Sequence, residues 1–134
     1  MADKIKEIEK IIKYSFKESS LLKVSLTHKS YDNIKNNEKL EFLGDRVLGV
    51  VISSMLFNKF ESLNEGDLSK KFSYLVQKKF LYKISADLLL DKIVIYDSKK
   101  SNNKMVISIL SDSVESIIGS IFVDGGYKSS YTFI

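Results

Sequence analysis

The sequence predicts an all-α fold, and three observations support this prediction. Apolar residues recur at helical spacing along most of the 134 residues. The chain contains no proline that would interrupt a helix. Internal repeats and linker-like segments are absent from the sequence, which indicates one domain built around one core.

Three helices are expected in the first half of the chain. The first is amphipathic, because four isoleucines share one of its faces: Ile5, Ile8, Ile11 and Ile12. A short second helix is expected over residues 21–30. The third, from Glu38 to Phe60, is apolar on most sides, so we expect it to lie at the centre of the bundle.

Two long helices are expected in the second half. One begins at Gly66-Asp67 and runs to about Leu88, and the other spans residues 105–123. Between them, residues 88–96 fit a short helix or an extended segment equally well, and residues 97–104 form a polar loop. Asp124-Gly125-Gly126 then provides a C-terminal stop.

The last residues suggest one further helix. Ser129 or Ser130 is a suitable N-cap, but only about one turn follows before Ile134, and a single turn is not stable alone. We therefore expect the natural protein to continue, and this chain to be truncated near its C-terminal helix.

Composition excludes several classes of protein. With 44% hydrophobic and 28% charged residues the chain is globular, and no apolar run approaches the ~20 residues of a membrane span. The N-terminus lacks the apolar stretch of a secretory signal. Cysteine is absent, which excludes disulfides, thiolate zinc sites and cysteine nucleophiles. We expect a cytoplasmic protein without a membrane partner.

The charge balance favours a polyanionic partner. The net charge is +4 and the pI is about 9.1. Arg46 is the single arginine among these basic residues, and lysine neutralises phosphates without reading bases bidentately. Any nucleic-acid binding should therefore depend on the backbone more than on base sequence. Nucleotide bias in the genome is an alternative explanation of the lysine content.

Acidic residues stand on two helices that are otherwise apolar. Glu38, Glu41 and Asp45 have i, i+3, i+7 spacing and fall within roughly 60° on one face. Asp112 and Glu115 share a face in the same way. Two ionised carboxylates ~6 Å apart repel by roughly 3 kcal/mol at an effective dielectric of about 20. Four such groups (Glu41, Asp45, Asp112 and Glu115) predict a divalent metal site, with Mg²⁺ or Mn²⁺ favoured by the all-oxygen ligands.

Simpler explanations stay open for each pair. Glu38 and Glu41 have basic neighbours, so surface ion pairs could account for them. No lysine or arginine lies between Met105 and Val123, so Asp112 and Glu115 would need buried polar contacts instead. Among other residues, His28 is expected to be structural. Gly44 costs about 1 kcal/mol inside a helix relative to alanine, and room for a partner or a metal shell is favoured over close helix packing as its cause.

These residues resemble the motifs of the ribonuclease III family. Asn37-Glu-Lys-Leu-Glu-Phe-Leu-Gly-Asp45 is similar to the family signature, and Ser111-Asp-Ser-Val-Glu-Ser-Ile-Ile-Gly119 to its second acidic motif. Leu26-Thr-His-Lys-Ser30 and Glu65-Gly-Asp-Leu-Ser69 match two lesser motifs in the same order. The resemblance runs from about Ile8 to Gly126 and is to the bacterial class with a single nuclease domain.

The resemblance implies a function and a set of site residues. It implies a homodimeric catalytic domain that cuts both strands of double-stranded RNA in rRNA and mRNA processing, leaving 5′-phosphate and 3′-hydroxyl ends with short 3′ overhangs. Mg²⁺ is the implied cofactor, with Mn²⁺ as a substitute. The implied metal ligands are Glu41, Asp45, Asp112 and Glu115, of which Asp45 and Glu115 are catalytic. Glu38 and Glu65 would line the cleavage cleft, and Phe42 would plug a socket in the partner subunit.

Two other classes of function were weighed. A catalytically silent relative that only binds RNA or supports assembly would be expected to lose one of the four acids, and this chain keeps them all. A di-iron bundle protein would need Glu-x-x-His motifs, which the sequence lacks. The C-terminal double-stranded-RNA-binding domain of the bacterial class is absent from this chain, so we expect weaker and more salt-sensitive RNA binding.

Overall fold

A computed structural model describes residues 2–134, and within them the predicted all-α fold is confirmed. The elements are α1 (Ala2–Ile12), α2 (Ser19–Ser25), α3 (Glu38–Lys59), α4 (Glu65–Val76), α5 (Lys78–Asp87), the short 3₁₀ turns η1 (Leu90–Lys92) and η2 (Ser98–Lys100), and α6 (Asn103–Phe133). In the described part of the chain the only β pairing is an isolated bridge between Thr27 and Ile95.

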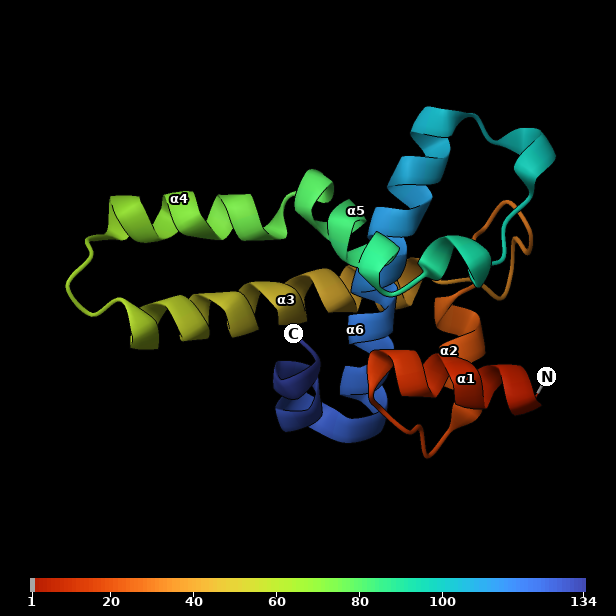
Figure 1. Ribbon diagram of the computed structural model, residues 1–134, viewed down its shortest axis with the longest axis horizontal. Helices are drawn as coiled ribbons and strands as arrows, with labels where there is room; N and C mark the ends of the chain where they lie inside the picture. Colours follow the sequence, from red (N-terminus) through yellow and green to blue (C-terminus); the bar gives the residue numbers. More distant parts are fainter. Residues whose placement is uncertain (1) are drawn as a thin grey trace.

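The crossing of α3 and α6 is the centre of the fold. Figure 1 shows α3 lying lengthwise, α4 running back beside it, and α6 crossing the N-terminal part of α3. The middle of α6 is buried apart from the partly exposed Asp112, and its apolar side chains meet those of α3 in one continuous core. The core side chains at this crossing include Val47, Leu48, Val51, Val114, Ile117, Ile118 and Ile121.

The N-terminal helices cover one side of this crossing. The prediction that α1 is amphipathic is confirmed, because Ile8 and Ile12 are buried. The helix ends before Lys13, which has a left-handed φ of 58°. The prediction of a helix over residues 21–30 was wrong in its second half. Beyond Ser25 the chain turns at Leu26, Thr27 forms an isolated bridge with Ile95, and a second turn begins at His28. The backbone N–H of His28 donates to the carbonyl of Ile95 at 2.8 Å.

The predicted fourth helix is in fact two helices. The chain breaks at Gln77, whose φ of −73° and ψ of 154° are extended. Neither glycine nor proline marks the break, and both halves have the helical apolar period, so the break has no local sequence signal. The break allows α4 to follow α3 while α5 packs against α6.

The segment between α5 and α6 combines both alternatives that the sequence left open. Leu89 is left-handed with a φ of 56°, η1 follows, and Ile95 then donates its backbone N–H to Leu26 at 2.8 Å. The predicted polar loop contains η2. Helix α6 starts two residues earlier than predicted, because the side chain of Asn102 caps it by accepting from the N–H of Met105.

The predicted stop near the end of the chain is a kink. Gly126 has a φ of 81°, and helical structure resumes directly after it and runs to Phe133. The prediction that Ser129 or Ser130 caps this last segment was wrong. Ser130 is buried inside it, and its hydroxyl donates to the carbonyl oxygen of Gly126 at 3.1 Å.

Helix α6 also corrects the expectation about membrane spans. Within residues 2–134, α6 is the one helix long and apolar enough to cross a membrane by length and composition. However, 67% of its most apolar stretch is buried inside the domain. This burial is typical of the core helix of a globular protein.

Candidate metal centre

Two glycines allow α3 and α6 to touch through their backbones. A Cβ atom on Gly119 would lie 2.1 Å from the carbonyl oxygen of Leu40, and one on Gly44 would lie 1.7 Å from that of Glu115. Both distances are far below any permitted contact. Close helix packing therefore explains Gly44, and the sequence interpretation that favoured room for a partner or a metal shell was wrong.

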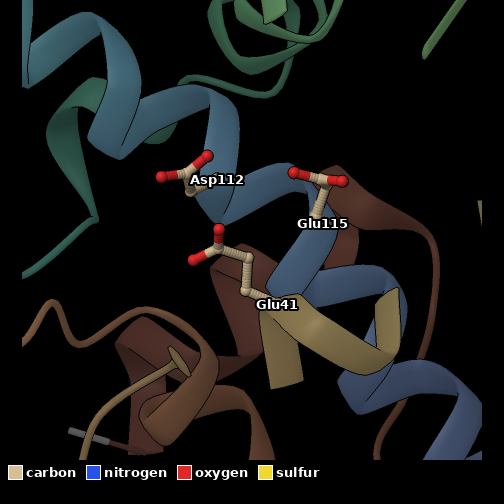
Figure 2. Close-up of side chains that lie close together, drawn as sticks. All are labelled: Glu41, Asp112 and Glu115. Atoms are coloured by element: carbon tan, nitrogen blue, oxygen red, sulfur yellow. The ribbon is translucent and has the colours of Figure 1, made fainter. Parts of the chain in front are cut away.

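This close crossing brings three of the predicted acids together. Figure 2 shows Glu41 of α3 pointing towards Asp112 of α6, with Glu115 one turn further along α6. Each residue offers a carboxylate oxygen, and these oxygens lie within 4.8 Å of one another. We call Glu41, Asp112 and Glu115 the carboxylate cluster. Glu115 is the most enclosed of the three, with only 8% of its surface exposed.

The cluster holds more negative charge than its surroundings stabilise. Burial, followed by the charge of Asp112, raises the pKa of Glu41 to about 7. Burial, followed by the neighbouring carboxylate of Asp45, raises the pKa of Glu115 to about 9. Burial also raises the pKa of Asp112, although Lys78 acts against it. Such shifts are expected where carboxylates share a site without enough positive charge between them.

Asp45 lies beside the cluster but outside the group of three. Its carboxylate is next to Glu115, whose pKa it helps to raise. It accepts a hydrogen bond from Nη1 of Arg46 at 2.8 Å, and half of its side chain is exposed. The guanidinium of Arg46 also stacks over the ring of Phe42, 4.2 Å from its centre. Asp45 thus pairs with Arg46 while its carboxylate stays close enough to Glu115 to affect that residue's pKa.

The two acids assigned to a cleavage cleft occupy different places. Glu38 is exposed one turn before Glu41 on α3, and its charge contributes to the raised pKa of Glu41. Glu65 begins α4, beside the end of α3 that is remote from the cluster (Figure 1), where it lines a cavity with Ser53 and Phe57. A single chain therefore does not bring Glu65 to the carboxylate cluster.

Phe42 and His28 are the two remaining residues that the sequence analysis singled out. Phe42 is 58% exposed on α3, so this chain alone does not bury it. His28 forms a hydrogen bond between Nδ1 and the hydroxyl of Ser30 at 2.8 Å. Burial, followed by the charge of Lys29, lowers the pKa of His28, while Asp112 and Glu38 act in the opposite direction. The histidine therefore lies within the electrostatic influence of the cluster.

Lys78 is the neighbour of the cluster that sequence reasoning did not single out. Its Nζ lies 3.7 Å from Oδ1 of Asp112 and also donates to the hydroxyl of Ser108. No sequence signal identifies Lys78, because the helix break at Gln77 that directs it to α6 lies within a continuous apolar period.

The fold and the site together define an all-α domain with an oxygen-only candidate centre for a divalent cation. A family model described as ribonuclease-III-like matches residues 18–134. The chain belongs to this ribonuclease-III-like family. The assignment agrees with the motifs on α3 and α6 that supply the carboxylate cluster.

Individual relatives support the assignment. The chain is 40% identical over 129 residues to Ribonuclease 3 of Pelagibacter ubique, and 43% identical over 130 residues to Ribonuclease 3 of Campylobacter jejuni. Each alignment covers 96% of this chain and 58% of the relative. The chain therefore spans a little over half the length of these curated relatives.

Solved structures agree at the level of the domain. A structure of the nuclease domain of ribonuclease III from Campylobacter jejuni, described for flexibility in a region involved in dimer formation, superposes with a TM-score of 0.91 and 43% identity. It matches 96% of this chain and 92% of that one. A second structure of that domain gives a TM-score of 0.88 at 42% identity.

Proposed function

We propose that this chain is the endonuclease domain of a ribonuclease III that hydrolyses both strands of double-stranded RNA. The observation that carries the proposal is the carboxylate cluster, in which three acids from two helices converge within 4.8 Å. The family assignment and the nuclease-domain structures support it. The expected products carry 5′-phosphate and 3′-hydroxyl ends with short 3′ overhangs, and rRNA and mRNA precursors are the proposed substrates.

We propose Mg²⁺ as the natural cofactor, with Mn²⁺ as a substitute. The donor set fits a hard divalent cation, because it consists of carboxylate oxygens. Burial, followed by the charge of neighbouring carboxylates, raises the pKa values of Glu41 and Glu115, and a cation would favour their charged forms. Glu41, Asp112 and Glu115 would hold the cation. Asp45, next to Glu115, is the proposed fourth ligand and has Arg46 as its partner in the metal-free chain.

The residues of this chain would hold the cation and bind the RNA. A bound divalent cation supplies Lewis acidity, which polarises a phosphodiester and lowers the pKa of water. Glu115 and Asp112 would fix the position of the cation from α6, and Glu41 would do so from α3. No nucleophilic side chain is required, which agrees with the absence of cysteine from the sequence. Lysine-rich surfaces would bind A-form RNA through its phosphates and 2′-hydroxyls.

A homodimer is part of the proposal. Phe42 is exposed on the same helix as Glu41, and a neighbouring subunit would cover it. Glu65 is remote from the cluster of its own chain, so a role in the cleavage cleft would require a second subunit to bring it there.

We also propose a cytoplasmic location for the protein.

Cleavage of a long, perfect RNA duplex tests the proposal directly. We expect short duplex products from the wild type only when Mg²⁺ is present. Asp45→Ala and Glu115→Gln should give no products while they keep the helical circular dichroism spectrum of the wild type. Asp87→Ala, which removes an exposed acid at the end of α5, is the matched control and should cleave normally. A folded wild type that binds Mg²⁺ and RNA without cleaving would instead favour the catalytically silent relative.

A further inference from the structure

Lys78 is anchored at the edge of the carboxylate cluster by three contacts with α6. Its ammonium donates to the hydroxyl of Ser108 and lies 3.7 Å from the carboxylate of Asp112. Its backbone carbonyl accepts a hydrogen bond from the hydroxyl of Ser111 at 3.2 Å. Because α5 begins at this residue, directly after the break at Gln77, both its main chain and its side chain face α6.

The ammonium of Lys78 is nevertheless open to solvent. The side chain is 61% exposed, whereas that of Asp112 is only 21% exposed. An ion pair this exposed contributes little to stability, about 0–1 kcal/mol, so stabilising the fold is a weak reason for the arrangement. A lysine presented to solvent beside an acidic site is well placed to meet an anion that approaches the same site.

The charge of Lys78 acts on two members of the cluster. It opposes the raised pKa of Asp112 and also that of Glu41, which lies on the other helix. Lys78 is thus a counter-ion of the carboxylate cluster. A divalent cation bound by these carboxylates would neutralise them and leave the ammonium without an anionic partner.

We propose that Lys78 is a substrate-binding residue of the metal centre: it pairs with Asp112 in the metal-free chain and binds a phosphate oxygen of the RNA backbone when the carboxylates hold a divalent cation. The proposal rests on the proposed function, because it requires both a cation and a polyanionic substrate at this site. It assigns Lys78 to the phosphate of the bond being cut or to the phosphate next to it. A compact ammonium suits a single phosphate oxygen, since lysine binds phosphate as a point charge.

Two effects of opposite sign follow from this assignment. Replacing Lys78 by methionine removes a positive charge that competes with the metal, so the metal should bind more tightly. The same substitution removes a phosphate contact, so RNA binding and cleavage should weaken. A lysine that only stabilised the fold would, when lost, weaken metal binding and cleavage together. The two measurements therefore separate substrate binding from a purely structural role.

The experiment compares Lys78→Met with Lys78→Arg and with Lys83→Met. Lys83 is an exposed lysine on the same helix that makes no salt bridge within the described residues. Binding of Mn²⁺ alone is followed by electron paramagnetic resonance, without RNA. Affinity for an RNA duplex is measured over a range of salt concentrations with saturating Mg²⁺ in the Glu115→Gln background, where Glu41 and Asp112 remain to hold the cation. The kcat and KM of cleavage are measured with Mg²⁺ and an intact Glu115.

For Lys78→Met we expect Mn²⁺ to bind about two- to five-fold more tightly, in line with the loss of an exposed charge contact. We expect kcat/KM to fall about 10- to 100-fold, as for a lost hydrogen bond to a charged group. The slope of log affinity for RNA against log salt should shrink by about 0.9, the value for one phosphate contact. Lys78→Arg should recover most of the cleavage, and Lys83→Met should match the wild type in its Mn²⁺ affinity and kcat/KM.

Failure of this inference differs from failure of the proposed function. If the wild type cleaves RNA but Lys78→Met and Lys83→Met behave alike, Lys78 has no role in substrate binding. Weaker Mn²⁺ binding by Lys78→Met would also overturn the assignment, because it would indicate structural damage. If the wild type neither binds Mn²⁺ nor cleaves RNA, the proposed function as a metal-dependent nuclease is refuted, and the proposed role of Lys78 is refuted as well. If it binds Mn²⁺ and RNA without cleaving, the RNA salt slope alone decides the role of Lys78.

Discussion

Gly44 of α3 lies directly against the backbone carbonyl of Glu115 in α6. A Cβ atom at Gly44 would come within 1.7 Å of that oxygen, so only glycine fits. Glu41 stands three residues before Gly44, and Glu115 carries the most buried carboxylate of the cluster. The contact that packs the two core helices is therefore also the contact that brings acids from both helices together.

The first prediction tests this contact. Gly44→Ala should destabilise the domain by about 3 kcal/mol or more, because an overpacked core contact forces the two helices apart. Gly49→Ala is the matched control on the same helix. A Cβ there would meet only the tip of the Phe72 ring at 3.8 Å, an ordinary contact. Alanine should stabilise that position by about 0.5–1 kcal/mol through its higher helix propensity.

Urea denaturation of both variants measures the difference. The separation of the two helices in Gly44→Ala should also weaken Mn²⁺ binding, whereas Gly49→Ala should leave it unchanged. Equal stabilities for the two variants would show that the α3–α6 contact is looser than described here, and that the position of Glu115 does not depend on it.

The second prediction concerns the pH dependence of stability without metal. Burial raises the pKa of Glu41 to about 7 and that of Glu115 to about 9, both above the ordinary value near 4.5. Above pH 4.5 the unfolded chain releases these protons while the folded chain retains them, so the unfolded state is favoured as pH rises. The stabilising contribution is complete below pH 4.5 and is lost as pH rises through 7 and 9.

Thermal unfolding in EDTA checks this expectation. We expect Tm to fall by roughly 5 °C or more between pH 5.5 and 9, since about 1 kcal/mol shifts Tm by a few degrees in a domain of this size. Mg²⁺ should raise Tm more at pH 8.5 than at pH 6, because the cation binds the deprotonated carboxylates. In Glu115→Gln the fall of Tm with pH should be smaller, because the carboxyl group with the most strongly raised pKa is removed. A metal-free Tm that is independent of pH would contradict the assigned charge state.

The fold was predictable wherever one helical pattern continued without interruption. The long apolar pattern and its polar start predicted α3 from Glu38 to Phe60, against an observed end at Lys59. The division between α4 and α5 was not predictable, because Gln77 leaves the helical conformation for tertiary reasons and carries no local signal. The end of the chain was predicted in part: Gly126 does interrupt the helix, but helical structure resumes directly after it and not at the predicted caps Ser129 or Ser130.

The site was predictable from spacing in part. The regular spacing of acids on two apolar helices correctly predicted that Glu41, Asp112 and Glu115 converge. Helical spacing does not specify rotamers, so it could not predict that Asp45 turns towards Arg46. Nor could it locate Lys78, because the turn that directs this residue to α6 follows the unpredicted helix break.

The third prediction addresses the dimer. Phe42→Ala should shift the monomer–dimer equilibrium towards monomer by at least about ten-fold, since a buried phenylalanine at an interface contributes on the order of 2 kcal/mol or more. Its ring is 58% exposed in the single chain, so the stability of the monomer should change little. Sedimentation equilibrium measures the shift.

Ile34→Ala is the control for that experiment. Ile34 is 89% exposed in the segment before α3, so its loss removes exposed apolar surface away from the helix face that carries Phe42. We expect it to leave the equilibrium within two-fold of the wild type. A dimer that survives Phe42→Ala unchanged would place the interface on another face.

The last prediction concerns Asp124, which ties the end of α6 to the segment between α1 and α2. Its carboxylate accepts hydrogen bonds from the hydroxyl of Tyr14 at 2.6 Å and from the backbone N–H groups of Lys17 and Glu18, both at 2.9 Å. Burial opposes ionisation of Asp124, but these three donors overcome it and lower its pKa. Burial, followed by the contact with Asp124, raises the pKa of Tyr14 to about 12, so its hydroxyl keeps the proton that it donates.

Asp124→Asn should therefore destabilise the domain at pH 7 by about 1–3 kcal/mol, because the neutral amide cannot accept from all three donors. Tyr14→Phe removes one donor and should cost about 0.5–1.5 kcal/mol. Because the folded pKa of Asp124 is lowered, its contribution is present above the ordinary value near 3.8 and is lost as pH falls through the folded pKa. Urea denaturation at pH 7 and pH 3 should show the deficit of Asp124→Asn shrinking in acid, and a deficit that persists undiminished would mean that the charge of Asp124 contributes nothing to this contact.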